Sequence, residues 1–280
     1  MVNGFFRTLF FTALFSMTAS AFAQQFPVLS KTRPAGTKDA EDIFQTGMRI
    51  RSGKGGEKKN PEMAGDYFEL SMTKGSAKAA LALADMYRYE FVKKGAKSKR
   101  DKYRVTLYDY AAKAGCPDAW AALAGCHEKG AGMKKNLEKA QELAQKAAEA
   151  GSPKGMEIHG RLLIEQKKDV ETGRQWLQRA INAGNGDAGM PLADTYAREK
   201  DVLGIVRSLR EGAAKGSRPC LMVLSGIFAN GHYGQTKDAS HAACYRKLAE
   251  AMDPYDTPQP IANLDRLCPK KKFLMPFKNR

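Results

Sequence analysis

The chain has 280 residues and is strongly basic, with 46 Lys and Arg against 30 Asp and Glu and a formal net charge of +16. Such a charge attracts nucleic acid, anionic lipid or acidic protein through long-range fields that salt screens. No segment beyond the amino-terminal one approaches the roughly 20 apolar residues that a bilayer span requires. The composition therefore excludes a membrane-spanning protein once that first segment is removed.

Residues 1–23 have the three-part layout of a secretory signal peptide. Arg7 precedes an apolar run from Leu9 to Phe15, and Ala21-Phe22-Ala23 supplies the small-x-small site that a signal peptidase requires. We expect cleavage after Ala23 and a periplasmic or secreted protein without a transmembrane segment in its mature chain. The removed residues hold one arginine and no acid, so 45 Lys and Arg remain against 30 Asp and Glu, or +15.

An exported protein rarely meets nucleic acid, so the charge favours an acidic protein or an envelope polyanion as partner and argues against nucleic acid. The alternative is that scattered lysines only keep the surface soluble. Residues 24–38, with Pro27, Pro34 and Gly36, are expected to form a flexible leader.

Residues 39–253 contain an internal repeat that two markers define. In the first marker, an Ala-rich helical pattern ends in glycine at nearly regular intervals, which shorten slightly along the chain. Glycine ends a helix there because it takes the left-handed conformation without a Cβ clash. These glycines are Gly75, Gly115, Gly151, Gly184 and Gly216, and Asp253 takes their place in the last unit.

The second marker is a basic residue followed by Asp or Asn, which predicts the start of the second helix in each hairpin. The acid or amide would cap the helix by accepting hydrogen bonds from the unpaired N–H groups of its first turn. Its distance from the terminating position is the same in every unit except the one that starts at Asp101, where it is one position shorter. The pairs are Lys59-Asn60, Arg100-Asp101, Lys135-Asn136, Lys168-Asp169, Lys200-Asp201 and Lys237-Asp238.

The first helix of each unit carries a small residue and then bulky residues at four-residue steps, which stay on one helical face. Ala79, Leu83 and Tyr87 show the pattern. No hairpin can bury such a face alone, so neighbouring hairpins must stack. The sequence predicts an all-α fold, an α/α superhelical solenoid of about six helix-hairpin repeats.

The repeat resembles the Sel1-like (SLR) repeat family, relatives of the tetratricopeptide repeats. The similarity is carried by Cys220 to Leu248, and by Ala119 to Gly151 through Gly130, Gly132 and Asn136, and it covers about residues 40–253. The second unit departs through a longer, very basic loop at 92–102, and the fourth and fifth units lack loop glycines and should have tighter loops. The resemblance implies a non-enzymatic scaffold that binds other proteins, with exported bacterial members active in host interaction, envelope processes or toxin neutralisation.

Such solenoids bind partners on a concave face and on exposed loops. We expect the basic loop of the second unit to be the most distinctive contact surface for a protein partner, which its charge predicts to be acidic. A merely solvated loop is the alternative. The candidate residues are Lys93, Lys94, Lys97, Lys99, Arg100, Lys102 and Arg104. Residues 254–280 are expected to form a capping segment, with a short helix over Ile261–Leu267, and a basic tail.

Two other functions are considered: a periplasmic immunity protein that neutralises a toxin, and a weak cell-wall or β-lactam hydrolase. The second rests on Ser71-Met72-Thr73-Lys74, which has the S-x-x-K spelling of penicillin-recognising serine enzymes but lacks their S-D-N and K-T-G companions. His241 and Cys244 share a helix face and suggest a zinc site, yet Cys244 lies at a core position of the repeat. We predict no catalytic, cofactor-binding or metal-binding residues.

Five cysteines would meet an oxidising compartment after export. Cys116 and Cys126 are separated by ten residues of mostly helix, roughly 15 Å at 1.5 Å per residue, which exceeds the Cα separation of a disulfide. A bridge among Cys220, Cys244 and Cys268 is expected, and the sequence leaves the pairing open.

Overall fold

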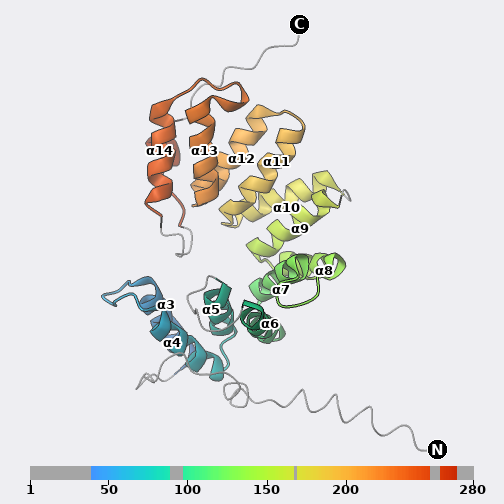
Figure 1. Cartoon of the computed structure of the whole chain (residues 1–280), viewed down its shortest axis with the longest axis vertical. Coiled ribbons are helices and arrows are strands. Elements are labelled where there is room, and N and C mark those ends of the chain that lie inside the picture. The colour runs from blue at the N-terminus through green and yellow to red at the C-terminus, as the bar shows by residue number, and fades with distance from the viewer. Residues whose placement is uncertain (1–38, 89–96, 167–168, 253–258, 270–280) are drawn as a thin grey trace, which may run out of the picture. The chain divides into compact units, whose positions relative to one another are not determined.

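The computed structural model describes residues 39–88, 97–166, 169–252 and 259–269. Within these ranges the regular elements are all helices, arranged as six consecutive hairpins and a short final helix, so the predicted fold class is confirmed. Figure 1 shows the two helices of each hairpin running side by side in opposite directions. The predicted signal peptide, the leader and the last eleven residues of the basic tail lie outside the described residues.

The chain divides into two compact units. The first comprises Met1–Ala119 and Lys129–Lys135, and the second comprises Trp120–Glu128 and Asn136–Arg280. The first unit holds α3 (Ala40–Ser52), α4 (Pro61–Thr73), α5 (Ala77–Arg88) and α6 (Lys97–Lys113), whereas α7 (Pro117–Lys129) has residues in both. The second unit holds α8 (Leu137–Glu149), α9 (Pro153–Glu165), α10 (Val170–Asn182), η1 (Gly186–Ala188), α11 (Gly189–Arg198), α12 (Val202–Ala214), α13 (Arg218–Asn230), η2 (His232–Gly234), α14 (Ala239–Glu250) and α15 (Leu264–Leu267).

The terminating glycines and five of the six Asx residues do what the sequence predicts. Five of the Asx residues accept a hydrogen bond from the backbone N–H three residues later, at 2.9 to 3.1 Å, and so cap α4, α8, α10, α12 and α14. The five terminating glycines have φ between +82° and +101°, in the left-handed region. Asp253, the expected terminator of the last unit, lies outside the described residues.

The prediction that a helix begins at Asp101 is wrong, because α6 begins four residues earlier, at Lys97. Lysine and arginine are good helix formers, so the basic segment continues the helix toward its amino end although its first turn contains no acid. Asp101 therefore lies inside α6, where its carboxylate forms an ion pair with Arg104 at 3.3 Å.

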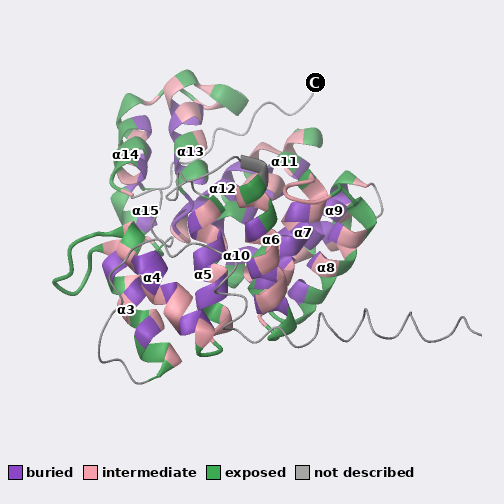
Figure 2. Ribbon diagram, turned by 60° about the horizontal axis from the view of Figure 1, so that its bottom comes forward, coloured by how far each residue is buried: buried purple, intermediate pink, exposed green. Residues whose placement is uncertain are grey.

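The predicted apolar seam is buried. Ala79 is fully buried and Leu83 is 1% exposed, as expected for residues that hold neighbouring helices together. Helices carry buried residues along one side and exposed residues along the other (Figure 2). Between α9 and α10 the backbones approach so closely that a Cβ on Gly160 would lie 2.6 Å from the carbonyl oxygen of Gly173.

The connections within the hairpins also agree with the sequence. The fifth hairpin turns within Glu199–Asp201, whereas the third uses residues 130–136, so this loop without glycines is tighter, as predicted. The connection of the fourth hairpin includes residues 167–168, which lie outside the described residues. The predicted capping helix exists but is shorter, covering Leu264–Leu267. No helix in the described parts of the chain is long and apolar enough to cross a bilayer.

Candidate protein-binding surface

The basic segment predicted to bind a partner is in part the first two turns of α6. Lys93 and Lys94 lie outside the described residues, and Lys97 begins the helix. Lys99 and Lys102 are exposed. These two lysines are therefore presented from a helix rather than from a loop.

The two arginines of the same set are not fully exposed. The Arg104 side chain is 12% exposed and pairs with Asp101, while Arg100 is half-buried. A cation held against its own helix in this way contributes to the packing of α6 and offers little surface to a partner. The structure therefore separates the predicted set into two exposed lysines and two arginines that lie closer to the core of the first unit.

The inner side of α6 is fixed to α5 by a buried polar contact. The Tyr108 hydroxyl, on a side chain that is 1% exposed, donates to the Asp85 carboxylate at 2.9 Å. Burial raises the pKa of Asp85, outweighing the hydrogen bond from Tyr108 and the positive field of Arg88. The Tyr87 and Tyr103 rings meet edge to face beside it, with centroids 4.8 Å apart. These contacts fix the position of α6, which carries the exposed Lys99 and Lys102.

The glycine-containing connection 130–136 packs against the start of α6. Its residues up to Lys135 belong to the first unit, as α6 does. Gly132 has φ of +77°, and a Cβ there would lie 2.4 Å from the carbonyl oxygen of Asp101. Only glycine fits this contact, because any side chain would meet rigid helix backbone. Gly132 therefore supports the basic turns of α6.

Ser71, the nucleophile suggested by the S-x-x-K spelling, is fully buried. Its hydroxyl donates to the carbonyl oxygen of Ala40 at 2.5 Å and so joins α4 to the first turn of α3. The Ser71 hydroxyl is thus used in helix packing and is closed to a substrate approaching from solvent.

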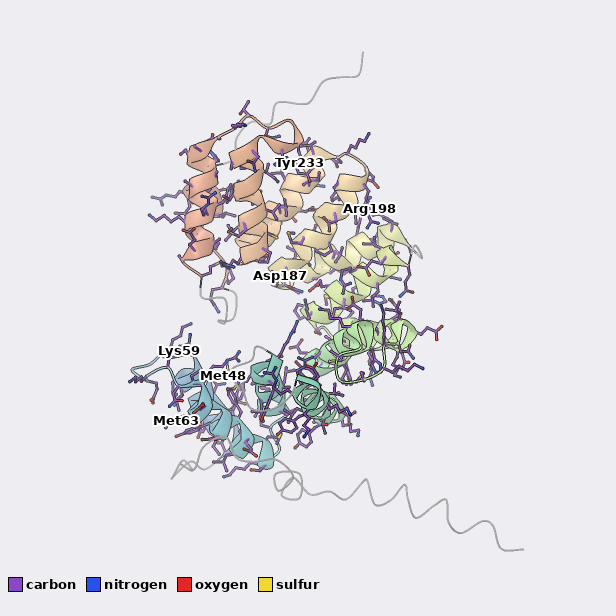
Figure 3. All side chains as sticks on the ribbon, viewed as in Figure 1. Met48, Lys59, Met63, Asp187, Arg198 and Tyr233 are labelled. Atoms are coloured by element: carbon purple, nitrogen blue, oxygen red, sulfur yellow. A yellow bond between two sulfur atoms is a disulfide. The ribbon has the colours of Figure 1, made fainter. Side chains whose placement is uncertain are left out.

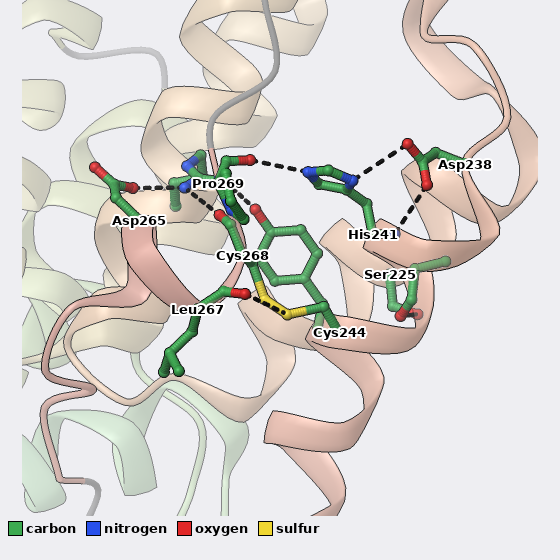
Figure 4. Close-up of a disulfide and its surroundings, with 11 residues drawn as sticks. Ser225, Asp238, His241, Cys244, Asp265, Leu267, Cys268 and Pro269 are labelled. Carbon is green, nitrogen blue, oxygen red and sulfur yellow. Dashed lines mark hydrogen bonds and ion pairs between the residues drawn. A yellow bond between two sulfur atoms is a disulfide. The ribbon is translucent and has the colours of Figure 1, made fainter.

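The cysteines of the last repeat resolve the disulfide that the sequence left open. Cys244 and Cys268 are bonded, with their Cα atoms 6.0 Å apart (Figure 4). The Cys244 sulfur is therefore not a zinc ligand, and His241 instead contacts Asp238 at 3.2 Å and the carbonyl of Pro269 at 2.9 Å. Cys220 is fully buried, and burial raises the pKa of its thiol to about 11.

The disulfide is part of a larger attachment of residues 259–269 to α12 and α14. The Arg210 guanidinium contacts the Tyr245 hydroxyl and the Asp265 carboxylate, and it donates to the carbonyl of Cys268 at 3.0 Å. The amide of Ile261 donates to the carbonyl of Ala214 at 2.9 Å. We call residues 259–269 the carboxy-terminal clasp.

The hairpins correspond to a known repeat. The family model described as "Sel1 repeat" matches residues 40–76, 117–152 and 157–185. The chain therefore contains three Sel1 repeats. Its matched repeats are the hairpins α3–α4 and α7–α8 and most of α9–α10. The matches do not include 220–248, the segment compared with the family in the sequence analysis, although the same hairpin recurs there as α13–α14.

Solved structures of several other proteins have similar folds. A Sel1 repeat protein from Oxalobacter formigenes is 22% identical with a TM-score of 0.58, over 78% of this chain and 90% of that one. The immunity protein Pa5087 from Pseudomonas aeruginosa is 18% identical with a TM-score of 0.60, over 80% of this chain and 87% of that one.

A protective antigen of uropathogenic Escherichia coli, c5321, is 24% identical with a TM-score of 0.56, over 82% of this chain and 47% of the antigen. No curated protein matches the chain. At these identities the likeness concerns the fold.

Proposed function

We propose that this Sel1-repeat protein is an exported scaffold that binds an acidic protein partner through the basic segment at the start of α6, with the concave face of the repeats as a further contact surface. The observation that carries the proposal is the pair Lys99 and Lys102, exposed on a helix whose opposite side is anchored by Tyr108 and Asp85. A rigid support lowers the entropy cost of ordering a binding surface. The nearby Lys93, Lys94 and Lys97 add charge in the sequence.

Export is supported by the signal-like residues 1–23 and by the disulfide between Cys244 and Cys268. Disulfides persist in oxidising compartments such as the periplasm and are rare in reducing ones. We therefore place the partner in the periplasm or outside the cell.

Charge reversal tests the proposal. A variant with Lys93, Lys94, Lys99 and Lys102 changed to Glu should lose its partner in pull-downs from the producing organism, because like charges across an interface repel. The matched control reverses Lys54, Lys58, Arg246 and Lys247, which are exposed elsewhere, and should retain the partner. Equal recovery of the partner by both variants would refute the proposal.

An immunity role is the second candidate, because the fold is shared with Pa5087 and with PA5088, another Pseudomonas aeruginosa immunity protein, at 18% identity in each case. It requires one toxin as a stoichiometric partner of very high affinity, encoded by a neighbouring gene. Size-exclusion chromatography of the captured complex distinguishes the two functions. An immunity protein would elute with one stoichiometric partner, whereas an adaptor would recover several partners at lower affinity.

The hydrolase alternative is the weakest of the three, because the Ser71 hydroxyl is buried against Ala40. Labelling by a fluorescent penicillin that is lost in Ser71→Ala would revive it.

A further inference from the structure

Large apolar side chains are exposed at one recurring place in the second unit. Leu137, Val170, Leu203 and Tyr233 are each between 41% and 44% exposed, and they make up four of the six exposed large apolar residues in the described chain. Leu137, Val170 and Leu203 follow one another at equal spacing in the sequence. Each of the four occurs in a different hairpin, so the exposure recurs with the period of the repeat.

These residues share one edge of the unit. Leu137 and Val170 are the first residues of α8 and α10, Leu203 is the second of α12, and Tyr233 lies in the turn between α13 and α14. All four thus occur where the first helix of a hairpin ends and the second begins. In Figure 3, Tyr233 and Arg198 lie toward this end of their hairpins, and Asp187 lies at the opposite end. We call the four residues the apolar row.

The backbone of this edge is fixed in conformations that side chains seldom adopt. Tyr233 has φ of +55° and Lys200 has φ of +59°, although neither is glycine. Non-glycine residues held in the left-handed region are strained and often occur at binding sites. Tyr233 itself belongs to the apolar row, and Lys200 is an exposed residue three positions before Leu203.

The acids on this edge are mostly engaged within the unit, whereas the cations are not. Glu165 pairs with Arg161 at 3.0 Å and Glu199 pairs with Arg174, while the acids Asp169, Asp201 and Asp238 cap their helices. Glu171, exposed beside Val170, lies 3.9 Å from Arg174, and Glu138, exposed beside Leu137, is the exception. In the part of the chain that the structure describes, the exposed cations Arg198, Lys200 and Lys237 make no ion pair.

We propose that this edge of the second unit binds an elongated acidic segment of a partner protein, whose apolar side chains cover the apolar row and whose carboxylates meet Arg198, Lys200 and Lys237. The regular spacing suits one extended or amphipathic segment that crosses several hairpins, since each hairpin offers an apolar contact at the same place and the cations lie beside it. The proposal rests on the scaffold role proposed above but uses a surface other than the start of α6.

A protein segment fits this edge better than an anionic membrane surface does. Glu138 and Glu171 are exposed and directly follow Leu137 and Val170 in the chain. A sheet of lipid phosphates would meet these carboxylates together with the apolar side chains and be repelled by them. A peptide can place its own acids against the cations alone.

Defined peptides test the proposal. The probe is a fluorescent peptide of repeated Glu-Leu-Ser units, long enough to cross several hairpins, and its controls replace either Glu by Lys or Leu by Ser. The parent protein should bind the probe and neither control peptide. Changing Leu137, Val170 and Leu203 to Ser should weaken binding about tenfold or more, since the variant loses three of the four apolar contacts. Changing Arg198, Lys200 and Lys237 to Glu should do the same.

Two matched variants make the result specific. Met222→Ser with Leu267→Ser alters the two exposed large apolar residues outside the row in the described chain and should leave the affinity within about twofold. Lys99→Glu with Lys102→Glu alters α6 and should also leave the affinity unchanged. A parent that does not bind the probe, or a row variant that binds as the parent does, would overturn the proposal.

The remaining outcomes separate this surface from its rivals. Loss of peptide binding in the α6 variant but not in the row variant would overturn the edge proposal and leave the proposed function standing. Binding to phosphatidylglycerol vesicles that depends on the row, without peptide binding, would assign the edge to a membrane surface and overturn it as well.

Discussion

His159 occupies a position at which four other first helices carry leucine. It lies eight residues after the terminating glycine Gly151, and Leu83, Leu123, Leu192 and Leu224 lie eight residues after their own terminating glycines. The histidine is 6% exposed, its Nδ1 lies 2.8 Å from the Gln141 side-chain nitrogen, and its ring meets the edge of Trp176 at 5.4 Å. The histidine thus takes a core position of the repeat. Burial lowers the pKa of His159 below 6.5 because the charged ring would lose hydration.

This burial predicts a pH-dependent stability. Below pH 6.5 the unfolded chain binds a proton at this histidine that the folded chain resists, so the free energy of unfolding should fall as pH drops from 6.5 through the folded-state pKa. His159→Leu should remove that part of the pH dependence. Urea unfolding at a series of pH values, followed by circular dichroism, measures both proteins, and an equal slope in the two would contradict the role of His159.

Gly132 gives a second prediction at this scale. Gly132→Ala should destabilise the protein by about 1–3 kcal/mol, because the left-handed backbone and the contact with Asp101 both exclude a Cβ. Gly125→Ala is the matched control, since Gly125 is helical and a Cβ there meets nothing within 4 Å. The control should be neutral or stabilising because alanine favours the helix. Similar melting temperatures for the two variants would contradict the close packing of 130–136 on α6.

Some single residues could be assigned from the sequence and others could not. Caps and terminating glycines were predictable because their roles depend on neighbours three or four positions away. The Asp85–Tyr108 contact and the Arg210 contacts join residues that are 23 and up to 58 positions apart, so no local pattern marks them. The pairing of Cys244 with Cys268 also required the fold.

Among the elements, α6 departs most from the prediction. In the other units a basic residue followed by Asp or Asn marks a helix start, but here the pair Arg100-Asp101 lies within α6, because its flanking lysines and arginine favour helix on both sides. Part of the predicted binding loop is thus a helix, which changes how Lys99 and Lys102 are presented. The carboxy-terminal clasp, in contrast, was expected as a capping segment, although its attachment through Arg210 was not.

The clasp gives a prediction for the last elements. Changing Cys244 and Cys268 to Ser should lower the free energy of unfolding by about 3 kcal/mol, the chain-entropy value for a crosslink of this length, since the two cysteines are 24 positions apart. Thermal unfolding with and without a reductant measures the effect. The reductant should destabilise the parent and leave the double variant unchanged. A parent insensitive to complete reduction would show that the other contacts hold the clasp alone.

At the scale of the whole molecule, the number and order of the hairpins followed from two markers that keep the same spacing in successive units. The binding surfaces did not follow from them as fully. The repeat pattern predicts which side chains each hairpin buries, whereas recognition of a partner depends on the side chains that stay exposed. The apolar row could therefore be identified only from the exposure of each residue in the structure. The two proposed surfaces lie in different units, α6 in the first and the apolar row in the second.

Site-specific photocrosslinking in the producing organism tests the scaffold function most directly. A photoreactive amino acid replaces Lys102 in one variant and Lys247, exposed in the second unit, in another, and mass spectrometry identifies the adducts. We expect position 102 to yield an acidic exported protein that position 247 does not. Failure to obtain an adduct at position 102, or the same adducts from both positions, would contradict binding at the start of α6.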